Sequence, residues 1–197
     1  TRSSNRRLYE KGLTQVLGMN FQKKDIPGGQ LMIVESAAAG FPMAVAHCHL
    51  FGLPGLKYGL RSGFETAFKM LVTIEKQTHY HWSQYLLGAC YDNGDGTKKN
   101  YTKAVEWYSK SSEQKNPVAM NNLGDCYSNG QGCDQNEKKG FEWYEKSANL
   151  GCSAAMTNVG MCYRDASGVT KDLNKATEWY TQAIGQRAVK AQQELDY

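Results

Sequence analysis

The apolar residues between positions 116 and 151 follow the spacing of two successive amphipathic helices. Within each set, most neighbours stand three or four residues apart, so they fall on one face of a helix. The first set comprises Ala119, Leu123, Cys126 and Tyr127. The second set comprises Phe141, Tyr144 and Ala148. No segment shows the period-two alternation of a β-strand, so the pattern predicts a pair of helices.

Turn-forming and capping residues mark the ends of these two helices. Pro117 suits the first turn of a helix, where its missing N–H costs nothing. The run from Ser128 to Gly132 is rich in turn formers and predicts the end of the first helix. Asn136 is a residue type that caps helices well, and Gly151 stands where a C-terminal glycine ends the second helix. The unit is therefore predicted to be helix, loop, helix.

The whole unit recurs at a step of 36 residues. A fixed period of this size is typical of a solenoid built from stacked repeats. The residues that keep the step include a glycine, a cysteine, a Trp-Tyr pair and a helix cap. They are Gly88, Gly124 and Gly160; Cys90, Cys126 and Cys162; Trp107-Tyr108, Trp143-Tyr144 and Trp179-Tyr180; and Asn100, Asn136 and Asp172.

The recurring glycine and cysteine are predicted to serve packing. A cysteine beside a glycine and a tyrosine can be a reactive thiol, a metal ligand, half of a disulfide or a packed side chain. A catalytic site is rarely needed three times in register, whereas a packing unit is needed in every repeat. We therefore expect Cys126 to be a small, buried, apolar residue. We expect Gly124, which costs about 1 kcal/mol in a helix relative to alanine, to let the second helix approach closely, with Trp143 lying over it.

The repeated motif resembles the Sel-1-like repeat (SLR), a relative of the tetratricopeptide repeat with a longer loop between its helices. The motif runs Leu-Gly-x2-Tyr-x2-Gly-x-Gly, then Asp/Asn-x2-Lys-Ala-x2-Trp-Tyr-x-Lys, and residues 80–187 carry three copies. The resemblance implies an all-α fold, a right-handed superhelical solenoid of antiparallel helix pairs. It also implies an adaptor or scaffold that holds proteins together.

The chain is expected to form a single repeat domain over residues 1–197. We divide it into units on the 36-residue step. The units are 1–40 (partial), 41–79 (degenerate), 80–115, 116–151 and 152–187 (clear repeats), and 188–197 (the start of a further unit, or a cap). In the degenerate unit, Phe64 and Ala67 are expected on the second helix.

The six cysteines raise the question of whether the repeats are cross-linked. The resemblance allows it, because some secreted members of that family are cross-linked repeat by repeat. However, Cys90, Cys126 and Cys162 occupy equivalent positions on successive repeats. Packed helices lie about 8–10 Å apart, whereas the Cα atoms of a disulfide lie within about 7 Å. We therefore expect no disulfide, free thiols and a cytoplasmic location; a secreted, periplasmic or endoplasmic-reticulum protein is the alternative if an N-terminal signal was removed.

Charge and hydropathy exclude two further classes of protein. The formal net charge of +4 is mild and the basic residues are dispersed, so we expect no nucleic-acid partner. No apolar run approaches the roughly 18 residues that cross a bilayer, so we expect no membrane span.

The histidines are the candidate metal ligands. They form two clusters, His47-Cys48-His49 and His79-Tyr80-His81. Residues at i and i+2 point to different faces of a helix, so we expect surface or interhelix histidines and no metal. The GDG and GQG turns are too short for a phosphate-binding loop, so we predict no enzyme and no cofactor.

By analogy with tetratricopeptide repeats, the first helix of each pair is expected to line a concave groove that binds a protein or peptide. Its predicted exposed side chains supply amides for a peptide backbone and aromatic rings for an apolar side chain. They are Trp82, Tyr85, Asp92 and Asn93 in one unit, Asn121, Asp125, Ser128 and Asn129 in the next, and Thr157, Met161 and Arg164 in the third. Asn121 and Asp125 are expected side by side, free of packing. The alternative is that these side chains form a polar surface with no role in binding.

Two other functions remain open. The runner-up is a structural or assembly subunit that docks by its convex face or by the ends of the solenoid. It includes end-to-end self-association near residues 188–197, because end repeats need capping. An enzyme or a metal-dependent protein is the third.

Overall fold

The computed structural model describes residues 3–4, 6–7, 10, 46 and 60–195 of the chain. Residues 60–195 form seven helices and no strand. The helices are α4 (Leu60–Thr78), α5 (His81–Asn93), α6 (Tyr101–Glu113), α7 (Pro117–Asn129), α8 (Glu137–Asn149), α9 (Ser153–Asp165) and α10 (Leu173–Leu195). The predicted all-α fold is confirmed.

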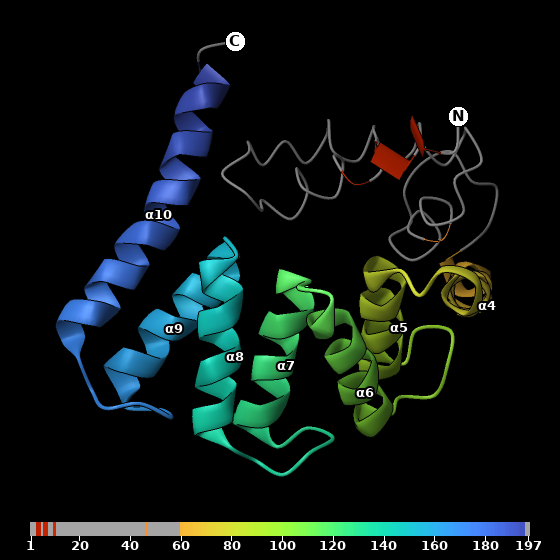
Figure 1. Ribbon diagram of the computed structural model, residues 1–197, viewed down its shortest axis with the longest axis horizontal. Helices are drawn as coiled ribbons and strands as arrows, with labels where there is room; N and C mark the ends of the chain where they lie inside the picture. Colours follow the sequence, from red (N-terminus) through yellow and green to blue (C-terminus); the bar gives the residue numbers. More distant parts are fainter. Residues whose placement is uncertain (1–2, 5, 8–9, 11–45, 47–59, 196–197) are drawn as a thin grey trace.

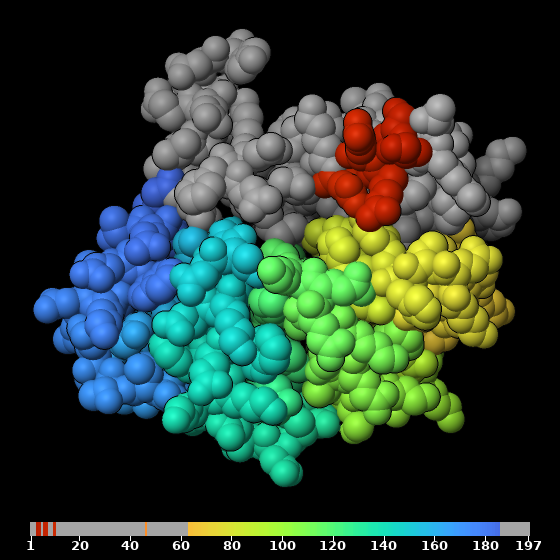
Figure 2. Space-filling model, in the orientation of Figure 1, coloured from red at the N-terminus to blue at the C-terminus, as the bar shows by residue number. Residues whose placement is uncertain are grey.

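The helices stack as antiparallel pairs. The closest neighbours are α5 with α6, α7 with α8, and α9 with α10. In addition α6 packs on α7 and α8 packs on α9, which joins each pair to the next. The helices succeed one another across Figure 1, and in the space-filling view they form one continuous body from α4 to α10 (Figure 2). This arrangement is a solenoid of helix pairs.

Asparagine and aspartate side chains start the second helix of every repeat, as predicted. Asn100, Asn136 and Asp172 each accept a hydrogen bond from the backbone N–H three residues later, at 3.0, 2.9 and 3.0 Å. Each bond satisfies one of the N–H groups that a helix leaves without a partner in its first turn. Asn116 caps α7 in a related way, and Pro117 follows it at the first helical position.

Residues in the left-handed conformation end the first helices. Gly94 follows α5 and Gly130 follows α7, with φ of 86° and 69°. Both donate their N–H to the carbonyl four residues earlier. Ala166 takes the same place after α9 with φ of 60°, a conformation that costs a residue with a side chain more than it costs glycine. Gly151, predicted to end α8, has φ of 85° directly after the C-cap Leu150.

A tyrosine ring from each second helix lies on the glycine of the first helix of the same repeat. A Cβ atom added at Gly124 would stand 2.6 Å from two ring atoms of Tyr144. The equivalent contacts are Gly88 with Tyr108 and Gly160 with Tyr180. We call this contact the glycine–tyrosine seat. The close approach predicted at Gly124 is confirmed.

The identity of the covering residue was predicted wrongly, because Tyr144 and not Trp143 lies on Gly124. Consecutive residues of a helix point about 100° apart, so only one of the two rings can face the glycine. Trp143 is half-buried and instead packs against a cluster that includes Ala104 and Ala119 of the preceding helices.

The core is a row of clusters along the stacked helices, and each repeated cysteine lies in a different one. Cys90, Cys126 and Cys162 are only 1%, 2% and 7% exposed, respectively, among other apolar side chains. Cys126 is therefore the small buried residue that was predicted. On α4, Ala67 is fully buried in the cluster that contains Cys90, and Phe64 packs against that cluster.

The two ends of the row carry contacts outside the repeat pattern. Tyr80 donates a hydrogen bond to Glu10 at 2.6 Å, and the Arg6 guanidinium lies 4.6 Å from the centre of the Tyr80 ring. At the other end α10 continues through residues 188–195, so these residues extend the second helix of the third repeat. Most of the expected unit 1–40 lies outside the described residues, as do residues 41–45 and 47–59 of the expected unit 41–79.

The seat predicts opposite effects for two Gly→Ala substitutions. In Gly124→Ala the new methyl group meets the Tyr144 ring, which is only 6% exposed and is held by a hydrogen bond from its hydroxyl to Asp125. Overpacking of this kind costs about 1–3 kcal/mol and outweighs the gain in helix propensity of about 1 kcal/mol.

Gly185→Ala on α10 is the matched control, because no described atom beyond its chain neighbours and its own turn of helix lies within 4 Å of the added Cβ. It should raise the free energy of unfolding by up to about 1 kcal/mol, whereas Gly124→Ala should lower it. Denaturant unfolding monitored by circular dichroism measures both. An equal gain in stability from the two substitutions would contradict the seat.

Candidate binding surface on the first helices

The predicted groove residues lie on α5, α7 and α9, the first helices of the three repeats, and they differ in exposure. The exposed members are Asn93, Asn129, Met161 and Arg164. The half-buried members are Tyr85, Asp92, Asp125, Ser128 and Thr157. We call these nine residues the first-helix surface. The remaining two, Trp82 and Asn121, are buried.

The predicted exposure of Trp82 is wrong. Its side chain is 6% exposed and belongs to a cluster that contains Leu71 of α4 and Leu86 of α5. The ring meets Tyr85 edge-on, with 5.7 Å between ring centroids. Because α4 departs from the repeat pattern, the repeats alone did not show that it covers this position.

The prediction that Asn121 lies on an exposed surface, free of packing, is also wrong. Its side chain is 9% exposed, and its Oδ1 accepts a hydrogen bond from Asn158 Nδ2 at 3.0 Å. Its own Nδ2 lies 3.4 Å from Asp125 Oδ2, so these two residues are neighbours as predicted. Asn121 therefore links α7 to α9 of the next repeat and contributes to stacking.

Two half-buried aspartates hold the hydroxyl groups of the seat tyrosines. Tyr144 donates a hydrogen bond to Asp125 at 2.6 Å, and Tyr108 donates one to Asp92 at 3.3 Å. The two carboxylates come from different positions of the repeat, since Asp92 corresponds to Ser128 and Asp125 to Ala89. Asp125 thus serves the packing frame, contrary to the prediction, as well as facing the first-helix surface.

Neither aspartate forms an ion pair with any residue that the structure describes. Burial raises the pKa of Asp125, the hydrogen bond from Tyr144 lowers it, and the negative charge of Asp92 raises it again, with a net increase. A cation placed beside Asp125 would relieve this penalty, because an opposite charge favours the ionised carboxylate.

The third repeat replaces these carboxylates. Met161 and Arg164 stand at the positions of Asp125 and Ser128. The hydroxyl of Tyr180 is accordingly buried without a hydrogen-bond partner among the described residues. Met161 is 43% exposed, and Arg164 is paired with the carboxylate of the next residue at 2.7–2.8 Å. The surface therefore changes from acidic on α5 and α7 to mixed on α9.

The exposed asparagines end two of the first helices. Asn93 donates a hydrogen bond to Asp95 at 3.2 Å. Asn129 is exposed at the end of α7 and makes no side-chain hydrogen bond to the described part of the chain. On α9 the Thr157 hydroxyl donates to the backbone carbonyl of Ser153 at 3.2 Å. Asn129 and Met161 can therefore be changed without disturbing the frame.

The described histidines lie where they were predicted, one at the surface and one between helices. His79 is exposed, and its Nδ1 lies 3.1 Å from Oε1 of Glu75. Nδ1 of His81 lies 3.2 Å from the amide of Asn116, and burial lowers the pKa of His81. Among residues 60–195 and the few described before them, no three metal-binding side chains gather. The cluster His47-Cys48-His49 lies outside the described residues.

The repeated cysteines are unsuited to nucleophilic chemistry. Burial raises the pKa of Cys90 and Cys126 to about 12 and that of Cys162 to about 11. At neutral pH these thiols are protonated, whereas the thiolate is the reactive form. Packing is the role that the geometry gives them.

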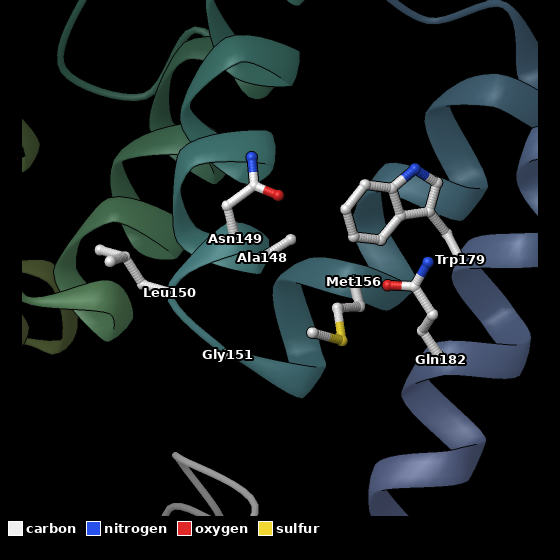
Figure 3. A pocket seen from close by; sticks show the side chains of 7 residues that line it. All are labelled: Ala148, Asn149, Leu150, Gly151, Met156, Trp179 and Gln182. Atoms are coloured by element: carbon white, nitrogen blue, oxygen red, sulfur yellow. The ribbon is translucent and has the colours of Figure 1, made fainter.

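A cavity beside α10 was not predicted from the sequence. It has a volume of about 450 Å³ and is bounded by residues 148–151, by Met156 of α9, and by Trp179 and Gln182 of α10. Figure 3 shows Trp179 and Gln182 directed across it from α10 towards Met156 and residues 148–151. The sequence did contain a signal, because the lysine found three residues after Trp107 and Trp143 becomes Gln182 after Trp179.

Comparison with known proteins decides the family. The Sel1 repeat profile matches residues 83–116, 117–152 and 153–186, which together make up more than half of the chain. This chain belongs to the Sel1 repeat family. Sel1 repeats are commonly protein–protein interaction modules, and their fold is typically a non-catalytic scaffold.

Solved Sel1 repeat structures resemble this one. The Escherichia coli protein c5321, a protective antigen of uropathogenic strains with an SLR fold, is 27% identical with a TM-score of 0.64 over 93% of this chain. A Sel1 repeat protein from Oxalobacter formigenes is 23% identical, with a TM-score of 0.67 over 94% of this chain and 70% of its own. Cysteine-rich protein B of Helicobacter pylori is 21% identical, with a TM-score of 0.50 over 60% of this chain and 90% of its own.

The chain spans 38% of the length of the c5321 structure. No curated protein sequence matches the chain. None of the helices within the described residues is long and apolar enough to cross a membrane.

The raised pKa of Asp125 predicts a pH dependence of stability. The folded state holds this proton more tightly than the unfolded chain, where the pKa of aspartate is about 3.9. The stability contributed by the protonated form is complete below that value and is lost as pH rises through the higher pKa of the folded state. Asp125→Asn keeps an acceptor for Tyr144 and removes the titration.

The free energy of unfolding of the native chain, relative to Asp125→Asn, should therefore fall as pH rises from about 4 towards 7. Urea unfolding of both proteins across that range measures the difference. A constant difference, or one that grows with pH, would show that burial does not disfavour the Asp125 carboxylate.

Proposed function

We propose that this Sel1 repeat protein is a non-catalytic interaction module that binds a protein or peptide partner along its first-helix surface. The proposal rests on the contrast between frame and surface positions of the same helices. The glycine of the seat and the cysteine two residues later are identical in all three repeats. The surface positions change at each step, as in the set Asp92, Ser128 and Arg164.

The chemistry of the surface supports a partner with a basic side chain. Asp92 and Asp125 are half-buried carboxylates whose described contacts include tyrosine hydroxyls but no cation. A lysine or arginine would pair with them and form charge-assisted hydrogen bonds. Asn93 and Asn129, at the ends of the same helices, offer amide groups that can bind a peptide backbone.

Docking by the end of the solenoid is the second candidate, and one observation favours it. Leu173 and Ile184 on α10 are large apolar side chains that are 58% and 63% exposed. Exposed apolar side chains of this size mark contact surfaces when they form a patch. Such a contact would use α10 and leave the first-helix surface open.

The first-helix surface is tested with Asn129→Ala combined with Met161→Ala. Both side chains are exposed, and neither holds a hydrogen bond of the frame, unlike Asn121 and Asp125. Partners captured on the tagged native chain are identified by mass spectrometry, and the affinity of a purified partner is then measured. The double substitution should weaken binding about tenfold, because two contacts of the interface core are truncated.

The matched control is Glu142→Ala combined with Glu178→Ala. It changes one exposed residue on each second helix of the same two repeats. It should leave binding unchanged, and neither variant should alter the melting temperature by more than a few degrees. Loss of binding in the control alone would place the interface on the second helices. Unchanged binding in both variants would favour docking by the α10 end.

We also propose that the chain works in a reducing compartment, as a cytoplasmic protein. This is supported by the location of Cys90, Cys126 and Cys162 in separate clusters of the core. Protein isolated from its cells in alkylating agent and then denatured should contain six free thiols, one for each cysteine. Two or more disulfides would contradict the proposal and favour an oxidising compartment.

A further inference from the structure

The second-helix tryptophans of the first two repeats are each covered by a lysine of the same helix. The ammonium nitrogen of Lys110 lies 4.1 Å from the centre of the Trp107 ring. The ammonium nitrogen of Lys146 lies 4.3 Å from the centre of the Trp143 ring. At such distances a cation is attracted to the negative face of the indole. The same lysine–tryptophan cation–π pair therefore occurs in both repeats, with the lysine supplied by the chain itself.

The third repeat keeps the tryptophan and loses the cation. Trp179 is followed three residues later by Gln182, and no cation of the described chain lies over its ring. A second lysine is lost at the same place, because Gly151 stands where the preceding repeat has Lys115. Both replacing residues, Gly151 and Gln182, line the cavity of about 450 Å³ (Figure 3).

We propose that this cavity receives the side chain of a lysine from a protein partner. Trp179 lines the cavity, and its indole can attract an ammonium group as Trp107 and Trp143 attract their own lysines. Met156 and Ala148 supply apolar wall for the four-carbon stem. Gln182 and Asn149 place amide groups at the cavity, whose oxygens can accept hydrogen bonds from an ammonium.

Three described lysines of the second and third repeats lie over other aromatic rings. Lys146 covers Trp143, Lys139 lies 4.0 Å from the ring centre of Tyr127, and Lys175 lies 5.2 Å from that of Tyr163. These three lysines therefore do not supply the cation, and we assign it to a protein partner. None of the nine residues of the first-helix surface lines the cavity, so a partner bound there would use a separate site.

The test uses the indole N–H signal of Trp179 in NMR spectra of the full chain labelled with nitrogen-15. Loss of one of the four tryptophan signals in Trp179→Phe assigns it. The probes are Nα-acetyl-lysine methylamide and its uncharged analogue Nα-acetyl-norleucine methylamide. The lysine probe should shift the Trp179 signal with a saturating titration curve. The norleucine probe should bind at least about fivefold more weakly, because it lacks a cation–π contact worth about 1 kcal/mol.

Gln182→Lys is the decisive variant, because it restores the lysine of the first two repeats and fills the site from within. It should weaken the response to the lysine probe at least about fivefold, by competition for the same face of the ring. Asn174→Lys is the matched control, since it adds a lysine at an exposed position near the start of α10. It should leave the response unchanged, and circular dichroism should show that both variants are folded.

Three results would overturn the inference. An equal response to norleucine would make the cavity a site for apolar side chains. An undiminished response in Gln182→Lys would show that the ammonium does not bind on Trp179. A shift of the Trp179 signal with protein concentration alone would identify the occupant as a second copy of this chain.

Discussion

The contact between a helical glycine and a tyrosine ring sets the spacing of the helices in every repeat. At Gly88, Gly124 and Gly160 a single added carbon would stand 2.5–2.7 Å from the ring of the tyrosine on the second helix. The two helices of a pair can approach this closely only without a side chain at that position. The ring in turn is fixed by burial, and in two repeats its hydroxyl donates to an aspartate of the first helix. Helix separation, core packing and the orientation of the first helix all follow from this contact.

Because the seat fixes the frame, other positions of the first helix are free to differ between repeats. Asp92 and Asp125 show that the separation is not complete, since the same carboxylates bind the seat tyrosines and face the first-helix surface. In the third repeat, where neither position is acidic, the Tyr180 hydroxyl has no partner in the described part of the chain. The choice of residue on the binding surface is thus constrained wherever the same side chain also takes part in core packing. Trp179 is a similar case, because Gln182 stands where the other repeats have a lysine and both line a cavity, while the seat at Gly160 is kept.

The 36-residue period predicted the helix pairs, the Asn and Asp caps and the buried cysteines, because each depends on local sequence repeated three times. It did not predict which ring covers Gly124, since the period is the same for Trp143 and Tyr144 and only the rotation of the helix distinguishes them. The burial of Trp82 depends on α4, which lies outside the clear repeats. The role of Asn121 depends on Asn158 in the next repeat, a contact that no sequence spacing reveals. Contacts between repeats were therefore the part that needed three-dimensional structure.

A double-mutant cycle at Gly124 and Tyr144 tests the central claim most directly. The free energy of unfolding is measured for the native chain, Gly124→Ala, Tyr144→Ala and the double variant. If the ring is what excludes a side chain at position 124, Gly124→Ala should destabilise the native chain but be neutral or stabilising once the ring is removed. The coupling energy should then reach about 1–3 kcal/mol, as for residues in direct contact. Additive effects, with Gly124→Ala equally costly in both backgrounds, would show that the Tyr144 ring does not set the spacing of the helices.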